Sequence, residues 1–392
     1  MKTKYPRNIN HGYAYTFFSY FGITGLWVMY LQTQGLSLVE IGLCESIFHI
    51  ASFIFEVPTG VLADRFTYRS VLIMGRISAI LSAIVILLGH SFWWFAIGFV
   101  LSALSYNLQS GTIDALMYDS LIKSKQTNVF PKIISNVNVI IEFGDTVGVV
   151  IAGFFVHWHF GLTYVISILI GFLGLVTVLL MNEPKLNTSL NEPHQTIKSI
   201  AVTAYQTLSH NRQLRGLMLF QAFFTGICTT YYYYFQSLMS KNHFSSIFIS
   251  SLLIVSAIVN IIGIKLTPTI QKQFSKRKLL TSLSFCLTIL LLTSWLNLLP
   301  LLITLFLVSQ LLGSLVEPIF SSYYNDLIDS QQRATLLSVA SVLFSVSMIA
   351  LFPAMGWLIQ THNFSFAFGS VGIILLIVLT MMFHNLRLTN HN

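Results

Sequence analysis

Charged side chains are what this sequence has least of. Asp, Glu, Lys and Arg make up 9% of its 392 residues, whereas hydrophobic residues make up 55%. Soluble domains carry about 25% charged residues, so this chain lacks the groups needed to cover a water-exposed surface. The deficit excludes an ordinary soluble protein and predicts that lipid surrounds most of the chain.

Residues that carry chemistry are also sparse. The chain has three cysteines; all lie in apolar runs, where we expect buried small side chains rather than disulfides or metal ligands. No Cys and His spacing resembles a zinc site, no nucleophile has a nearby base, and no phosphate-binding loop occurs. We therefore expect no enzyme activity, no metal and no cofactor.

What the sequence does contain is a series of long apolar runs. A helix needs about 20 mostly apolar residues to span a bilayer, and the runs are continuous rather than alternating, which excludes a transmembrane β-barrel. The first run is too long and too aromatic for a signal peptide. The sequence predicts an all-α membrane protein with twelve transmembrane helices, near 13–34, 38–62, 71–89, 92–120, 132–157, 161–181, 213–240, 244–270, 277–297, 300–325, 333–358 and 363–385.

The longest polar stretch divides these spans six and six. It predicts a six-helix bundle over 1–181, a cytoplasmic linker over 182–212 and a second six-helix bundle over 213–392. Similar segments, "MYDSLIKSKQ" from Met117 and "YYNDLIDSQQ" from Tyr323, end spans 4 and 10 and support a duplication. Repeated bundles are common in secondary transporters, with a substrate site near the membrane midplane.

The basic residues predict the orientation. If the N-terminus is inside, all but Lys241 of the 21 Lys and Arg residues fall on the inner side, which is the positive-inside pattern. We expect a multi-pass protein of the cell membrane with both termini in the cytoplasm. The net charge of +8 is then explained by topology and anionic lipid, without nucleic acid.

One charged loop carries a recognisable motif. The stretch "GVLADRFTYRSVL", residues 60–72, resembles the loop between helices 2 and 3 of the major facilitator superfamily, Gly-x-Leu-Ala-Asp-Arg-x-Gly-Arg-Lys-x-x-Leu. Arg69 replaces the lysine, while Thr67 and Tyr68 replace the second glycine and an arginine. The matching residues are Gly60, Leu62, Ala63, Asp64, Arg65 and Leu72.

This resemblance implies the major facilitator fold and a gating role for the loop. In the family the cluster latches the two halves when the transporter is closed to the cytoplasm. The residues that correspond are Gly60, Asp64, Arg65 and Arg69, and Asp119 at the inner end of span 4 is the expected partner of the arginines. The alternative is that the loop only anchors the chain by its positive charge.

A second resemblance lies in span 5. Antiporters of the superfamily carry a glycine-rich pattern there, Gly-x8-Gly-x3-Gly-Pro-x2-Gly-Gly. Here small size and spacing are kept but the proline is absent, and the alternative is ordinary close packing. The corresponding residues are Ser135, Gly144, Gly148, Val149, Ala152 and Gly153; the "EVPTG" and "RATLLS" segments also resemble drug-efflux members.

Acidic residues within spans are the candidate proton sites. They cost roughly 2.5–3.5 kcal/mol on insertion scales and suggest function by default. We expect no Lys or Arg at their depth, so a carboxylate would be protonated part of the time. Glu142 and Asp145 share one helix face and would titrate as a pair; Asp114, Glu317, Glu56 and Glu45 are further candidates, each of which could instead bond a carbonyl or a Tyr hydroxyl.

Aromatic and amide residues are the candidate lining of a substrate cavity. Aromatic walls with few polar groups and negative charge suit lipophilic or cationic organic compounds. Many aromatic residues must instead face lipid or pack between helices. The candidates are Tyr20, Trp27, Asn107, Gln221, Tyr232 and Gln236.

These observations favour a proton-coupled antiport carrier that exports small molecules by alternating access, similar to multidrug efflux proteins. We expect it to act as a monomer, with protons, membrane lipids and a small-molecule substrate as its partners. A carrier of a polar metabolite such as a sugar or amino acid is the first alternative, although hydrogen-bonding side chains and mid-span arginines look scarce. A lipid flippase or a non-transporting receptor is the second.

The topology can be tested by labelling. In a variant without Cys44, Cys228 and Cys286, an impermeant maleimide added outside should react with Trp158→Cys and not with Thr188→Cys, because residue 158 is placed outside and residue 188 inside. Opening the membrane with detergent should make Thr188→Cys reactive. The reverse pattern in intact cells would exclude the predicted topology.

Overall fold

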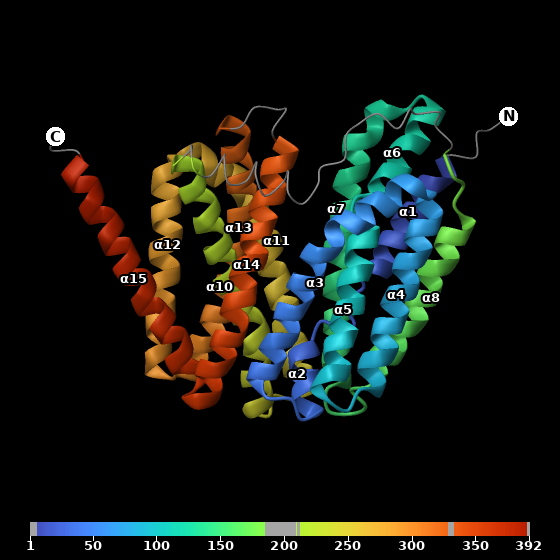
Figure 1. Ribbon diagram of the computed structural model, residues 1–392. Coiled ribbons are helices and arrows are strands. Elements are labelled where there is room, and N and C mark those ends of the chain that lie inside the picture. Colours follow the sequence, from blue (N-terminus) through green and yellow to red (C-terminus); the bar gives the residue numbers. More distant parts are fainter. Residues whose placement is uncertain (1–5, 185–208, 210–211, 328–332, 390–392) are drawn as a thin grey trace. The chain divides into compact units, whose positions relative to one another are not determined.

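The computed structural model describes residues 6–184, 209, 212–327 and 333–389. Within these ranges the regular structure is helical, without β-strands. From the N-terminus the helices, which can be followed in Figure 1, are α1 Pro6–Ser19, α2 Trp27–Thr33, α3 Leu38–Arg65, α4 Tyr68–Leu88, α5 Phe92–Gln109, α6 Thr112–Ser124, the 3₁₀ turn η1 Thr127–Val129, α7 Phe130–Phe155 and α8 Leu162–Leu180.

The C-terminal part of the chain continues the same pattern. Its elements are α10 Arg212–Lys241, α11 Ser246–Gln273, α12 Lys276–Thr293, the 3₁₀ turn η2 Ser294–Leu296, α13 Leu299–Leu327, α14 Arg333–Thr361 and α15 Phe364–Thr389. Eight stretches of the described helices are long and apolar enough to cross a membrane.

The chain divides into two compact units. The first contains residues 1–36, 44–199 and 244–253, and the second contains residues 37–43, 200–243 and 254–392. The start of α3 therefore groups with the second unit and the start of α11 with the first. Most of the expected linker over 182–212 lies outside the described residues, and the bundle limits at 181 and 213 stay predictions.

Each of the twelve expected spans contains a helix or a pair of helices, but two spans are interrupted. The expected span 13–34 is broken between Ser19 and Trp27, and the span 92–120 is broken at Ser110 and Gly111. Gly111 has a φ of 72°, a left-handed conformation that glycine adopts without strain. Both expectations of continuous helices were therefore wrong, because an apolar run does not reveal a local break.

Local capping explains where two helices begin. Glu40 Oε2 accepts a hydrogen bond from Ser37 N (2.9 Å), and Ser37 Oγ accepts one from Glu40 N (3.3 Å). This reciprocal pair is a capping box, which satisfies amide groups that a helix start leaves without partners. At the start of α4, the Thr67 hydroxyl accepts from Ser70 N (3.2 Å) in the same way.

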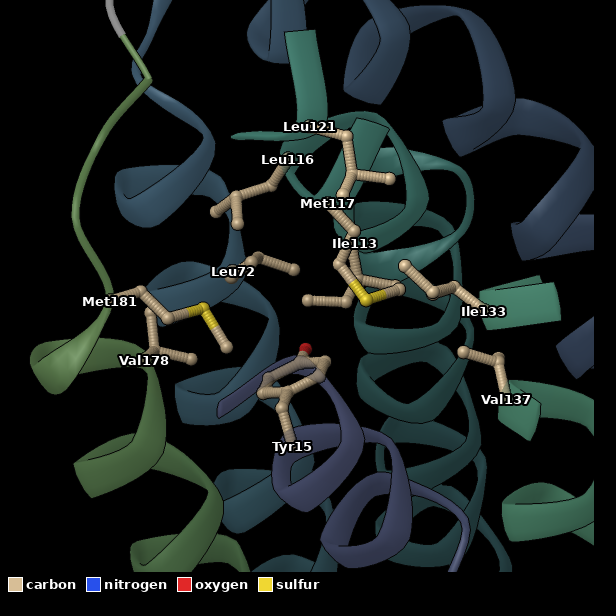
Figure 2. Close-up of a cluster of buried hydrophobic side chains, with 10 residues drawn as sticks. All are labelled: Tyr15, Leu72, Ile113, Leu116, Met117, Leu121, Ile133, Val137, Val178 and Met181. Atoms are coloured by element: carbon tan, nitrogen blue, oxygen red, sulfur yellow. The ribbon is translucent and has the colours of Figure 1, made fainter. Parts of the chain in front are cut away.

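The first unit has an apolar core where five segments meet. Figure 2 shows side chains from α4, α6, α7 and the end of α8 gathered around the ring of Tyr15 on α1. Tyr15 is 1% exposed, and Leu72, Leu116 and Met117 are fully buried. The remaining members are Ile113, Leu121, Ile133, Val137, Val178 and Met181.

A buried amide ties the same segments together at one end. Asn8 on α1 donates to Ser120 Oγ (2.8 Å) and to the Asn182 carbonyl (2.7 Å), and its Oδ1 accepts from Asn182 N (2.9 Å). Its side chain is fully buried. Asn8 thereby joins α1 to α6 and to the chain that leaves α8.

Removing this amide should destabilise the first unit. Asn8→Ala leaves the backbone groups of Asn182 without a partner, and a buried unsatisfied group costs about 1–3 kcal/mol. Asn10→Ala, on the exposed side of the same helix, is the matched control. Thermal unfolding in detergent should show a lower midpoint for Asn8→Ala only; equal midpoints would contradict the role assigned to Asn8.

Candidate functional site

The interruption of the first span lies against the glycine face of α7. Gly22 N donates to the Gly144 carbonyl (3.3 Å). A Cβ on Gly148 would overlap the backbone nitrogens of Gly22 and Ile23, the second at 2.6 Å. The small residues of α7 therefore let a non-helical backbone pack directly against the helix. Interrupted helices within a membrane are typical of substrate and ion sites in transporters.

Asp145 follows Gly144 on this face and reaches the interruption. Its Oδ1 lies so close to Gly22 that a Cβ there would overlap it. Among the described residues, Asp145 forms no ion pair with a Lys, Arg or His side chain. Its carboxylate is close enough to Glu142 for the two charges to interact, and both side chains are exposed within the unit. The structure thus brings these two predicted residues together beside broken backbone.

Asp114 lies at the second interruption. It is in the first turn of α6, directly after the left-handed Gly111. Its Oδ1 is buried and has no hydrogen-bond partner among the described residues. The side chain is near enough to Tyr20 for an electrostatic interaction, and Tyr20 begins the interruption of the first span. Tyr20 and Asp114 therefore connect the two broken helices.

Arg76 corrects the expectation that no Lys or Arg lies mid-span. It sits on α4 eight residues after Tyr68, about 12 Å along the helix, and is 6% exposed. Its Nη1 donates to Ser19 Oγ (2.5 Å), and its guanidinium lies 5.7 Å from the centre of the Tyr15 ring. The sequence alone places it with the basic residues of the inner side, because it lies in the first third of the predicted span 71–89.

The Tyr15 hydroxyl extends this polar group toward α5. It donates to Gln109 Oε1 (3.4 Å), one residue before the second interruption. The Nε of Arg76 is buried and makes no hydrogen bond within the described part of the chain. A buried positive charge therefore lies inside the first unit, held by α1 and α4.

The candidate lining residues occupy different environments. Asn107 bonds Ser52 twice: its Oδ1 accepts from the Ser52 hydroxyl (2.8 Å), and its Nδ2 donates to the Ser52 carbonyl. Its amide thus joins α5 to α3. Trp27 packs edge-on against Phe99, with ring centres 5.3 Å apart.

The remaining candidates from span 7 lie on α10. Tyr232 stacks on Phe306 of α13 at 5.6 Å. Gln236 is 2% exposed, and Gln221 is partly buried. The side chains of Glu317 and Asp64 lie outside the described residues, and Glu56 is exposed on α3. A cavity-lining role for these residues stays a prediction.

The charged loop joins α4, α6 and α8. The Tyr68 hydroxyl donates to Asp119 Oδ2 (2.9 Å). Tyr68 stands where the family motif has an arginine, so a hydrogen bond from a hydroxyl group takes the place of the ion pair that an arginine could form there. Arg69 instead donates from Nη2 to the Leu179 carbonyl (2.9 Å). An ion pair of Asp119 with Arg65 or Arg69 stays a prediction for the cytoplasm-closed state.

Glu183 completes this cluster and was missed by sequence reasoning. Its two carboxylate oxygens accept from the backbone amides of Tyr68 (2.9 Å) and Arg69 (3.1 Å). A carboxylate at a helix N-terminus is stabilised by the free amide groups and by the helix dipole. The only signal was a lone acid directly after span 6. Gly60, by contrast, has no described atom within 4 Å of the position of a Cβ.

With the fold and these contacts established, comparison with known proteins identifies the family. The family model described as Major Facilitator Superfamily matches residues 12–349. The chain belongs to the Major Facilitator Superfamily. The Bacillus subtilis (strain 168) protein called uncharacterized MFS-type transporter YxaM is 25% identical over 389 residues, which cover 92% of this chain and 93% of that protein.

Solved structures share the major facilitator fold at low sequence identity. The nucleoside transporter NupG aligns with a TM-score of 0.73 and 12% identity, covering 97% of this chain and 99% of that one. The D-xylose-proton symporter aligns with a TM-score of 0.66 and 14% identity, covering 95% of each chain. As a major facilitator, the protein is a multi-pass membrane transporter of small molecules and not an enzyme.

The contribution of the hydrogen bond from Tyr68 to Asp119 can be tested by measuring the stability of variants. Tyr68→Phe removes a bond to a carboxylate that is partly buried, which should cost about 1.5–3 kcal/mol. Tyr68→Arg restores the family residue and should lose less, because it can pair with Asp119. Tyr13→Phe, which removes an exposed bond to Asn136, is the control. If Tyr68→Phe and Tyr13→Phe unfold at the same temperature, the assigned role is wrong.

Proposed function

We propose that this major facilitator is a proton-driven exporter of lipophilic or cationic organic compounds, and that Asp145 holds the coupling proton. The observation that carries the proposal is the position of Asp145 against the interrupted backbone of the first span, with Glu142 one turn away. An interrupted helix and an acidic side chain at the same place are the parts from which ion and proton sites in carriers are built.

Two neighbouring carboxylates favour binding of a single positive charge. When both are ionised they repel each other, so either a proton or a cationic group lowers the energy of the pair. The proton and a cationic substrate therefore compete for the same site. Such competition couples their movements, provided that the two conformations of the carrier differ in affinity for the proton.

Aromatic rings next to the acids support the substrate class. Phe17 on α1 lies 5.5 Å from Phe21 and 6.3 Å from Phe143, measured between ring centres. Phe143 lies between Glu142 and Asp145 in the sequence and is 61% exposed. Aromatic faces beside negative charge bind organic cations and also accept lipophilic groups.

The direction and location of transport belong to the same proposal. Export is supported by the small-residue pattern of α7, which resembles that of antiporters. These small residues pack directly against the interrupted first span. The distribution of Lys and Arg supports a cell-membrane protein with cytoplasmic termini. A single chain contains both repeated bundles, which favours a monomeric carrier.

A carrier of a polar metabolite is the second candidate, and Arg76 favours it. A buried arginine beside Tyr15, Ser19 and Gln109 offers hydrogen bonds that a purely lipophilic substrate would not use. The similar folds of a nucleoside transporter and of a D-xylose-proton symporter are compatible with this alternative.

Transport into inverted membrane vesicles tests the proposal. A panel of lipophilic cations and polar metabolites identifies the substrate class, with and without an imposed pH gradient. Asp145→Asn and Glu142→Gln should each reduce pH-driven accumulation to the level of vesicles that lack the protein, while downhill exchange of the same compound remains. The physical reason is that the neutral variants no longer change charge with pH.

The matched control is Glu40→Gln. It also removes one carboxylate from a helix, but its amide oxygen can still accept the capping bond from Ser37, so pH-driven accumulation should persist. If the double variant of Asp145 and Glu142 accumulates substrate normally, the coupling role of this pair is excluded. If only polar metabolites are transported, the second candidate replaces the first.

A further inference from the structure

A buried acid and a buried base face each other on α3. His49 Nε2 lies 3.4 Å from Glu45 Oε1, one helical turn away, and the two side chains are 9% and 13% exposed. Residues four apart on a helix are neighbours on one face. The sequence identifies Glu45 as a candidate acid, but His49 was not recognised as its partner.

The charge of this pair depends on a single proton. With that proton present the pair is neutral overall, either as imidazolium and carboxylate or as imidazole and carboxylic acid. Without it, the pair carries one negative charge in a site that is largely closed to solvent, which is costly. Imidazole is also the side chain whose charge changes between about pH 5 and 8.

The surroundings contain few other charges. On α3 itself Glu40 is bonded to Ser37 and Glu56 is exposed. α5 packs beside the pair, with the rings of Phe48 and Tyr106 6.2 Å apart, and Tyr106 is its titratable group there. Of the described basic residues, His49 is the one that pairs with Glu45.

Tyr106, whose ring lies beside that of Phe48 on α3, is also near the interrupted helices. It interacts electrostatically with Tyr20, which in turn interacts with Asp114. No described Lys or Arg forms an ion pair with either end of this series.

We propose that Glu45 and His49 form a second proton-binding site, separate from Asp145, in which the two side chains share one proton. The carrier then holds protons at two places in its first unit, one beside the interrupted first span and one on α3. Because Asp145 plays no part in the argument, this site stands or falls independently of the proposed export function.

Nuclear magnetic resonance of the purified protein tests the site without any substrate. Imidazoles labelled with ¹⁵N are followed from pH 5 to 9, and the signal lost in His49→Gln identifies His49. That signal should titrate in a single step. In Glu45→Gln the titration midpoint should shift, because the imidazole has lost the carboxylate with which it shares the proton.

Two controls make the result specific. Glu40→Gln removes a carboxylate from the same helix and should leave the midpoint of His49 unchanged. Glu45→Asp retains the charge and should keep most of the shift, which shows that the signal does not simply report a misfolded protein. A His49 signal that does not titrate, or one whose midpoint is the same in wild type and Glu45→Gln, would overturn the proposal.

The transport assay separates this inference from the proposed function. Normal pH-driven accumulation in the Asp145 and Glu142 double variant would remove the proposed coupling role, yet the shift in the His49 titration would still establish the second site. Loss of accumulation in that double variant together with an unshifted His49 would retain the proposed function and remove the inference.

Discussion

Lipid offers no hydrogen bonds, and the rest of this structure depends on that constraint. Wherever a helix is interrupted within the membrane, its freed amides and carbonyls must find partners inside the protein. The interruption after Ser19 is possible because α7 presents Gly144 and Gly148, which allow backbone to contact backbone. The same close contact brings Asp145 to the broken segment. The packing of α7 against this segment therefore both stabilises the interruption and forms the candidate proton site.

Charged side chains inside the first unit are also paired with other groups of the protein. Buried Arg76 contacts a hydroxyl and an aromatic face, Asp119 accepts a hydrogen bond from a tyrosine, and Glu45 pairs with a histidine. These pairings join different helices, except for the pair on α3. Polar groups that would be costly alone are therefore held in small sets. The sets around Arg76 and Asp119 each fix a contact between two helices.

The sequence predicted much of this and missed the rest for identifiable reasons. Apolar runs placed the helices, and the small residues of α7 predicted close packing. The interruption at residues 20–26 was missed because the run is mostly apolar, and Gly22 and Gly25 were not taken as a helix break. Arg76 was misplaced because it was counted with the basic residues of the inner side, whereas it lies buried two turns inside α4. His49 was overlooked because a lone histidine has no periodic signal until its helical neighbour Glu45 is considered.

The tight contact at Gly148 also limits how this protein can evolve. Any side chain at that position would overlap the peptide nitrogens of Gly22 and Ile23, so a single substitution there cannot be tolerated without moving two segments at once. Phe143, the residue before Gly144, is 61% exposed and does not meet this constraint. Descendants of this chain would therefore change at Phe143 long before the glycine face of α7 changed.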